Sequence, residues 1–325
     1  MRRNSALALW GAALALLLCA CGGGETAPER RPVALIVKST GSEFFLSVFA
    51  GAQAAATEYN LDLTIAGPET EEDYETQNQM IAEAVEAGAE AIVFSAIDYE
   101  RNAAAIGEAA RQGVRIISID SGVGSESVKT YIGTDNYAAG QMAAKAALEG
   151  TGGTMYVGLV NYNEGTANGQ ERVRGAMDAL TGSGRAQIAG IATTLTEAGQ
   201  ARADAAALLE AHPEINVLLA FNEPTSVGAA QAVRDAGRSE DLFFVGFDSN
   251  VATIEGLQDG YVDALIVQNP YAMGYLGVES AYRLLSGQGG SLEPMVDTST
   301  QIVNRENLFT IDSQKALFAF ERFEK

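Results

Sequence analysis

The sequence has 325 residues, which is enough for about two domains that each bury a core. Hydrophobic residues make up 47% and charged residues 19%, so the composition is that of a globular chain and excludes extended disorder. The 42 acidic and 21 basic residues give a net charge of −21, which repels phosphate backbones, so we expect no nucleic-acid partner. One histidine, His212, and two cysteines cannot build a His/Cys zinc site, and we expect no metal and no cofactor.

The N-terminal residues have the pattern of a secretory signal. Two arginines precede an apolar run from Ala6 to Ala20, which is shorter than the roughly twenty residues that a membrane span needs. We therefore predict a signal peptide over residues 1–20. The run ends in Leu18-Cys19-Ala20-Cys21, which resembles the lipobox of bacterial lipoproteins, with Cys21 as the lipidated residue. An ordinary signal peptide or an uncleaved anchor is the alternative.

Residues 21–32 begin with Cys21 and three glycines and are otherwise mostly polar, which is typical of a flexible tether. Lipidation would use the only cysteine left after cleavage, so we expect no disulfide. The predicted location is extracytoplasmic, with a membrane anchor at Cys21.

Short apolar runs typical of strands buried on both faces alternate with helical patterns beyond the tether. The predicted strands are Val33–Val37, Leu61–Ala66, Ala91–Ser95, Val114–Ile119, Met155–Val160, Val217–Phe221, Leu242–Phe247 and Ala264–Val267. The predicted helices are Phe44–Tyr59, Tyr74–Ala87, Arg101–Gln112, Ala138–Leu148, Gln170–Leu180, Ala201–Ala211, Val227–Ala236 and Tyr271–Leu285.

This alternation predicts an α/β fold with parallel sheets covered by helices. Eight predicted strands are many for one open sheet, so two Rossmann-like lobes are the economical arrangement.

Ligands of such sheets bind at the carboxyl ends of the strands. The predicted ends carry amides, carboxylates and, after the first strand, two aromatic rings. Carboxylates accept hydrogen bonds from hydroxyl groups, amides donate and accept, and rings cover the apolar face of a sugar. The strand ends therefore favour a neutral polyhydroxyl ligand.

The order of several motifs resembles the type I periplasmic sugar-binding proteins, above all their ribose-binding members. The matching stretches are Ala34–Val37 with Phe44-Phe45, Gly51-Ala52-Gln53, Ile119-Asp120, Thr134-Asp135-Asn136, Glu171–Gly175, Ala211-His212-Pro213, Val245–Asp248 and Gln268. The resemblance covers about Val33 to Val303. It implies two lobes joined by a three-segment hinge near Asp135, Gln268 and Thr298. The N-terminal lobe would then be residues 33–134 plus 269–298, and the C-terminal lobe residues 135–268 plus 299–325.

The resemblance also implies a function and a site. The chain would be a monomer that binds a ribose-like pentose, a hexose or a related polyol and, by closing its lobes, delivers it to the permease of an ABC importer. Phe44 and Phe45 would flank the sugar ring. Hydrogen bonds would come from Asp120, Arg172, Asn222, Asp248 and Gln268, with possible further contacts from Lys38, Ser42, Ser95 and Ser121.

Four positions depart from the ribose pattern. Ser42 replaces an Asn, Glu43 a Pro and Ser121 an Arg, and Thr196 lies where an aromatic residue is expected. Losing a guanidinium and a ring removes groups that fix ligand geometry, so the sugar itself is left open.

Several of these residues also have a structural interpretation. One ring of the Phe44-Phe45 pair could belong to the core, and Asp120 could shape a turn. Asn222 and Asp248 stand where helix N-caps are expected. Arg172 could be solvated or could form a salt bridge between the lobes, while Lys38 could lie on the rim and Gln268 could serve the hinge.

The sequence also bears on enzyme, sensor and nucleoside-binding functions. The sequence has no phosphate-binding loop and no nucleophile elbow. Asp120 and Asp248 could form a glycosidase pair, but a nearby Arg172 would favour charged carboxylates rather than the required acid, so we expect no enzyme activity. A sensor subunit that signals to a kinase or chemoreceptor, and a nucleoside-binding lipoprotein, are the alternatives. Near the C-terminus, Leu317, Phe318, Phe320 and Phe323 suggest a short helix docked on a lobe.

Overall fold

The computed structural model describes residues 30–318. The predicted signal peptide, Cys21 and most of the tether lie outside the described residues, as do residues 319–325. Within the described part of the chain, no helix combines the length and apolar character needed to cross a membrane.

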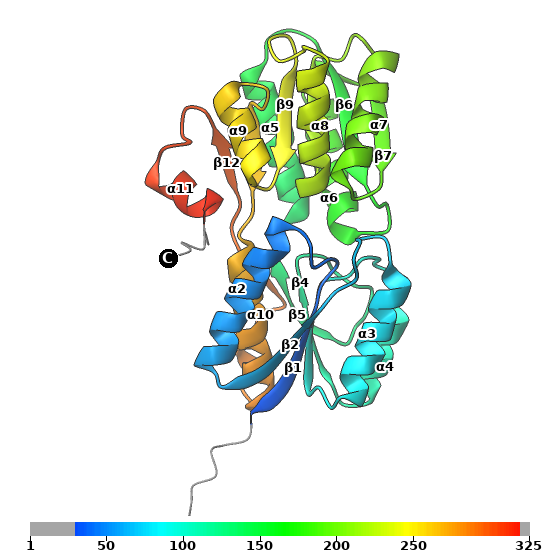
Figure 1. Cartoon of the computed structure of the whole chain (residues 1–325), viewed down its shortest axis with the longest axis vertical. Coiled ribbons are helices and arrows are strands. Elements are labelled where there is room, and N and C mark those ends of the chain that lie inside the picture. Colours follow the sequence, from blue (N-terminus) through cyan, green and yellow to red (C-terminus); the bar gives the residue numbers. More distant parts are fainter. Residues whose placement is uncertain (1–29, 319–325) are drawn as a thin grey trace, which may run out of the picture. The chain divides into compact units, whose positions relative to one another are not determined.

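Two six-stranded sheets form the framework (Figure 1). The first has the order β11-β5-β4-β3-β1-β2, and all its strands pair in parallel. Its strands are β1 (Arg31–Ile36), β2 (Leu61–Ala66), β3 (Ala91–Phe94), β4 (Arg115–Ile119), β5 (Val128–Gly133) and β11 (Met295–Asp297).

The second sheet has the order β12-β10-β9-β8-β6-β7 and is parallel except for β12, which runs antiparallel to β10. Its strands are β6 (Met155–Tyr162), β7 (Ala186–Thr194), β8 (Val217–Ala220), β9 (Phe243–Phe247), β10 (Ala264–Val267) and β12 (Gln301–Asn304).

Helices cover both faces of each sheet. In the first lobe, α2 (Glu43–Glu58) and α10 (Pro270–Leu285) pack on one face, and α3 (Tyr74–Glu86) and α4 (Ala103–Arg111) on the other. In the second lobe, α5 (Asn136–Gly150) and α6 (Ala167–Gly182) cover one face. The opposite face carries α7 (Ala198–Ala211), α8 (Glu223–Asp235), α9 (Val251–Asp259) and the short α11 (Ile311–Leu317). A 3-10 turn, Gly289–Ser291, follows α10 in the first lobe.

The chain passes between the two sheets three times. It crosses after β5 into α5, after β10 into α10, and between β11 and β12. The carboxyl ends of the parallel strands β4, β8, β9 and β10 therefore meet near these crossings, where ligand sites of such sheets lie.

Each lobe contains helices that pack closely through glycine. In the second lobe, a Cβ atom on Gly140 of α5 would lie 2.0 Å from the carbonyl oxygen of Arg172 on α6. In the first lobe, a Cβ atom on Gly51 of α2 would lie 2.0 Å from the carbonyl oxygen of Tyr271 on α10. A larger side chain cannot be placed at either point without moving a helix, so these glycines set the spacing of the pairs.

The two-lobe α/β fold predicted from the sequence is confirmed, with differences at individual elements. β1 begins at Arg31, two residues before the predicted start, so the end of the expected tether is strand. Four strands, β5, β7, β11 and β12, and helix α9 were not predicted. The edge strand β7 is partly exposed along most of its length, unlike the fully buried strands of the sheet centres. The C-terminal helix α11 ends at Leu317, close to where the predicted one was to begin.

Candidate functional site

A buried cleft lies where the two lobes meet, at the carboxyl ends of the strands. Its lining is Lys38, Ser42, Phe44, Phe45, Glu71, Asp120, Tyr162, Asn168, Arg172, Asn222, Glu223, Pro224, Asp248 and Gln268. Both lobes contribute, and most of these side chains are polar. The cleft encloses only about 20 Å³, which is room for roughly one water molecule. A larger ligand can enter only if the lobes separate.

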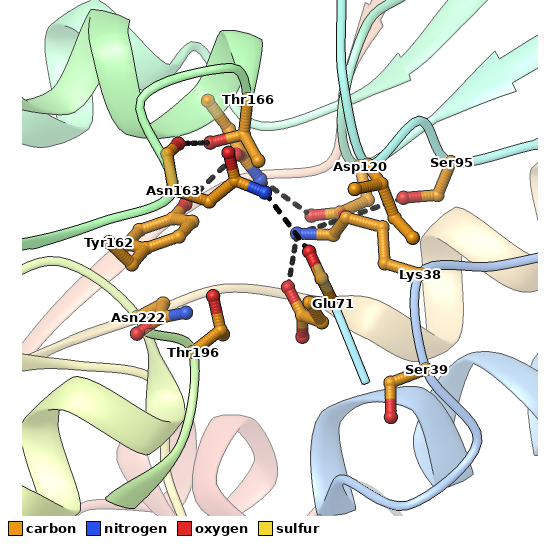
Figure 2. Close-up of polar contacts among 12 residues, drawn as sticks. Lys38, Ser39, Glu71, Ser95, Asp120, Tyr162, Asn163, Thr166, Thr196 and Asn222 are labelled. Carbon is orange, nitrogen blue, oxygen red and sulfur yellow. Dashed lines mark hydrogen bonds and ion pairs between the residues drawn. The ribbon is translucent and has the colours of Figure 1, made fainter. Parts of the chain in front are cut away.

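A charged cluster forms the first-lobe wall of the cleft (Figure 2). Lys38 lies at the end of β1, with its Nζ atom 2.9 Å from Glu71 Oε2 and 3.5 Å from Asp120 Oδ2. Ser95 donates a hydrogen bond of 2.7 Å from its hydroxyl group to Asp120 Oδ2. Burial alone would lower the pKa of Lys38, but Asp120 and Glu71 outweigh it and raise that pKa above its usual value. The lysine therefore stays charged inside the protein.

Asp120 and Asp248 occupy equivalent positions in the two lobes. Each directly follows a central strand, β4 or β9, and each has a left-handed backbone, with φ of 56° and 64°. Asp is one of the few residues other than glycine that tolerate this conformation. Both side chains are buried, and both line the cleft. The Asp120 carboxylate also accepts a hydrogen bond of 3.3 Å from Asn168 of the second lobe.

Arg172 is 1% exposed, and its guanidinium group donates three hydrogen bonds. Its Nε donates to Asn136 Oδ1 at 2.8 Å, its Nη1 to the carbonyl oxygen of Phe221 at 2.7 Å, and its Nη2 to Gln268 Oε1 at 2.8 Å. Its guanidinium carbon lies 4.7 Å from the ring centre of Phe247. Arg172 is thus not a solvated helix residue, and it ties α6 to three other segments beside the cleft.

Gln268 links the hinge to the second-lobe carboxylate. Its Nε2 donates to Asp248 Oδ1 at 2.6 Å, and its Oε1 accepts from Thr134 Oγ1 at 2.9 Å. Burial raises the pKa of Asp248 to about 6, against the opposing effects of Arg172 and Gln268. The Asp248 carboxyl group therefore changes charge close to neutral pH.

The N-terminus of α2 meets the second lobe through a carboxylate. Ser42 caps α2 by accepting a hydrogen bond of 3.2 Å from the Phe45 backbone N–H. The Phe44 N–H also lies in the first turn of α2, where backbone donors have no partner within the helix, and it donates at 3.0 Å to Glu223 Oε2 of α8. Burial raises the pKa of Glu223 to about 7, although the Phe44 hydrogen bond lowers it. Phe45 is 1% exposed and belongs to the first-lobe core, while Phe44 lies at the cleft.

Direct contacts between the lobes surround the cleft. The Tyr99 backbone N–H donates to the Gly165 carbonyl oxygen at 2.8 Å. The Asn163 amide donates to the Glu71 carbonyl oxygen at 3.0 Å. The Thr196 hydroxyl group donates to Glu72 Oε1 at 2.9 Å. The lobes are therefore closed against one another in this structure.

Of the two residues expected at helix N-caps, Asn222 and Asp248, only Asn222 is a cap. Asn222 is the N-cap of α8 in a capping box, and its Oδ1 accepts a hydrogen bond of 3.1 Å from the Thr225 N–H. Asn222 nevertheless lines the cleft. For Asp248 the cap interpretation is wrong, because the N-cap of α9 is Asn250.

The structure brings most of the predicted site residues together. Those that line the cleft are Lys38, Ser42, Phe44, Phe45, Asp120, Arg172, Asn222, Asp248 and Gln268. Ser95 lies outside the lining and contacts the cleft through Asp120. Ser121 is also outside the lining and is buried, with no hydrogen-bond partner for its hydroxyl group among the described residues. Cys21 lies outside the described residues.

Sequence reasoning missed four polar residues of the lining: Glu71, Tyr162, Asn168 and Glu223. Glu223 directly follows Asn222, so the same strand-end argument applies to it. Glu71 lies five residues beyond the end of β2, a strand whose end was not considered. Its pairing with Lys38 depends on how the loop folds back, and no local pattern signals that.

Comparison with known proteins agrees with the fold and with the cleft. A family model described as a periplasmic binding protein domain matches residues 33–289. The D-ribose/D-allose-binding protein of Pseudomonas aeruginosa is 28% identical over 286 residues, which cover 85% of this chain and 89% of that protein.

Two solved structures are similar over nearly their whole length. The carbohydrate transporter solute binding protein of Agrobacterium radiobacter, in complex with D-arabinose, is 27% identical, with a TM-score of 0.86 and coverage of 90% of this chain and 100% of that one. An ABC transporter solute binding protein of Agrobacterium vitis with bound D-fucose is 29% identical, with a TM-score of 0.84 and coverage of 88% and 99%. The resemblance to the type I periplasmic sugar-binding proteins is therefore confirmed, and this chain belongs to the periplasmic binding protein family.

Proposed function

We propose that the protein is an extracytoplasmic solute-binding lipoprotein of an ABC importer that binds a monosaccharide in the cleft between its lobes. The observation that carries the proposal is the pairing of Asp120 and Asp248, two buried carboxylates on opposite lobes that face one enclosed space. The names of its relatives support the same class, because they bind ribose, allose, arabinose or fucose.

The chemistry of the lining favours an uncharged polyol. Asp120 and Asp248 accept hydrogen bonds from hydroxyl groups, Asn222 and Gln268 can donate or accept, and the Phe44 ring offers an apolar surface for C–H groups. Lys38 is already paired with Glu71 and Asp120, so it offers no uncompensated charge for an anionic ligand.

Binding and lobe closure are coupled in this proposal. The closed cleft is too small for a monosaccharide, so the lobes must part, and contacts such as Phe44 to Glu223 must break, before the sugar enters. A sugar that touches both lobes favours, by its differential affinity, a loaded closed form whose cleft is wider than the cleft of this structure. The permease would then recognise the closed, loaded form.

Anchoring through Cys21 is part of the proposal and rests on the sequence Leu18-Cys19-Ala20-Cys21. Its test is fractionation of cells that express the full chain or Cys21→Ser. We expect the parent in the membrane fraction and the variant largely released from it. A parent protein found in the soluble fraction would exclude the lipid anchor and leave the cleft proposal untouched.

The central experiment measures thermal melting of the chain from Gly22 onward, refolded to remove carried-over ligand, against pentoses, hexoses, inositols and nucleosides. A ligand that binds only the folded state, at a hundred times its dissociation constant, adds about 2.7 kcal/mol to the free energy of unfolding. We expect one sugar subclass to raise the melting temperature. A shift with nucleosides alone would favour the nucleoside-binding alternative.

Two variants connect that shift to the cleft. Asp248→Ala and Asp120→Ala should each weaken sugar binding at least about tenfold, or about 1.4 kcal/mol, because a buried hydroxyl group loses its charged acceptor. The control is Asp178→Ala, whose carboxylate is exposed and accepts from Tyr137. Unchanged affinity in both cleft variants would show that the ligand binds elsewhere.

A further inference from the structure

A second, larger cavity lies beside the cleft and has no role in the proposed function. It encloses about 1080 Å³ between α2 of the first lobe and the start of α9 and end of α11 of the second. We call it the α2–α9 groove. Its lining includes Leu46 of α2 and Val251 of α9, whose side chains are 57% and 62% exposed. Large apolar side chains that face one open groove from two lobes indicate a docking surface.

The end of the described chain lies in this groove. Leu317 and Phe318, the last two described residues, both contribute to the lining. The Leu317 backbone is held near α9, because its carbonyl oxygen accepts a hydrogen bond of 3.4 Å from the Ser249 hydroxyl group. The described part of the chain therefore ends at the lining of the α2–α9 groove.

The composition of the next seven residues, Ala319 to Lys325, matches this surface. They contain Phe320 and Phe323, and two aromatic rings can bury a large apolar area. Phe320 and Phe323 follow Phe318 of the lining by two and five residues, which is about 7 and 17 Å of extended chain, so both rings can reach the groove face of α2. The segment carries two acidic and two basic side chains, so its side-chain charges balance beside the acidic lining residue Glu43.

From these observations we propose that residues 319–325 dock in the α2–α9 groove of their own chain, with Phe320 as the main anchor against Leu46 and Val251. A segment bound there contacts both lobes. It would also lie next to the candidate site, because Phe44, Asp248 and Gln268 line both the groove and the cleft. The docking does not depend on which ligand the cleft takes.

The test uses tryptophan fluorescence without any sugar. The sequence has one tryptophan, Trp10, so the full chain carrying Trp10→Phe provides a dark background. Phe320→Trp in this background should emit at shorter wavelength, and be less quenched by acrylamide, than Phe309→Trp. Phe309 is the matched control, since it lies just before α11, is 78% exposed and is outside the groove lining.

A second substitution assigns the signal to the groove. Leu46→Asp, added to Phe320→Trp, should shift the emission to longer wavelength and raise quenching to the level of Phe309→Trp. Ile191→Asp, at an exposed apolar residue of β7 outside the groove, should leave the signal unchanged. Three results would overturn the proposal: emission of Phe320→Trp equal to that of Phe309→Trp, insensitivity to Leu46→Asp, or a blue shift that appears only as protein concentration rises. The last would assign the groove to the segment of a second copy.

Discussion

The two lobes place an aspartate at the same point of the same fold and surround it differently. Asp120 and Asp248 both follow a central strand with left-handed backbone. Asp120 lies near the Lys38 ammonium group and accepts from Ser95, whereas Asp248 accepts from the neutral amide of Gln268. The two aspartates therefore share a backbone position but differ in the hydrogen-bonding and charged groups beside them.

The largest expected effect comes from removing the cation of the first lobe. Lys38→Met leaves Glu71 and Asp120 buried without their common counter-charge, so we expect the free energy of unfolding to fall by about 3–5 kcal/mol. Asp248→Asn in the second lobe should cost under about 1 kcal/mol, because its amide oxygen still accepts from Gln268.

Urea denaturation of both variants at pH 7 measures the contrast. Lys145→Met, at an exposed ion pair with Glu149, is the control and should change little. Equal losses for Lys38→Met and Asp248→Asn would contradict the difference between the lobes.

A buried carboxyl group of the second lobe, Glu223, should make the free energy of unfolding depend on pH. The pKa of Glu223 is raised from 4.5 to about 7 by burial. When a carboxyl group has a higher pKa in the folded than in the unfolded state, its full contribution to stability is present at pH values below the unfolded pKa. That contribution is lost as the pH rises through the folded pKa. We expect Glu223 to lower the free energy of unfolding between pH 4.5 and about 7, by at most about 3 kcal/mol.

Urea denaturation across this pH range checks the effect. Glu223→Gln, which cannot ionise but keeps an acceptor for the Phe44 N–H, should flatten the decline. Glu240→Gln, at an exposed position, should keep the slope of the parent. If Glu223→Gln declined as steeply as the parent, the buried carboxyl group would not be its source.

The smallest expected change in stability comes from the close contact between two helices through glycine, a feature that both lobes share. Gly140→Ala places a Cβ atom 2.0 Å from the Arg172 carbonyl oxygen, so α5 and α6 must move apart. We expect a loss of about 1–3 kcal/mol in the free energy of unfolding. Gly107→Ala in α4, where a Cβ atom makes only an ordinary contact, should stabilise the protein by about 0.5–1 kcal/mol. Thermal or urea unfolding distinguishes the two, and equal effects would show that the close packing is not required.

The fold was predictable where the strands are short and wholly apolar. β3, β8 and β10 are buried along their whole length, and each reads as a continuous hydrophobic run. β7 was missed because it alternates between partly buried and exposed residues at the edge of its sheet. β11 has only three residues, and β12 begins and ends with a polar residue, so neither forms a continuous apolar run.

The candidate site was predictable from local pattern where its residues follow strands, and elsewhere from the family resemblance. Asp120 and Asp248 directly follow β4 and β9, and Asn222 lies two residues beyond the end of β8, positions that the local pattern reveals. The hydrogen bonds of Arg172 could not be foreseen in the same way. Its partners come from α5, from the residue after β8 and from the hinge, and only tertiary packing brings these segments together.

The chain crossings have a consequence for the order of folding. The second-lobe elements from α5 to β10 are one uninterrupted stretch, 136–267, whereas the first lobe waits for α10. Val278 and Ala281 of α10 belong to the same core cluster as Ile117 of β4, so one face of the first sheet stays uncovered until that helix arrives. A long sequence separation between contacting residues slows folding. We therefore expect the lobe that begins the chain to acquire its native packing after the lobe that follows it, the reverse of the order in which a ribosome or a secretion channel releases them.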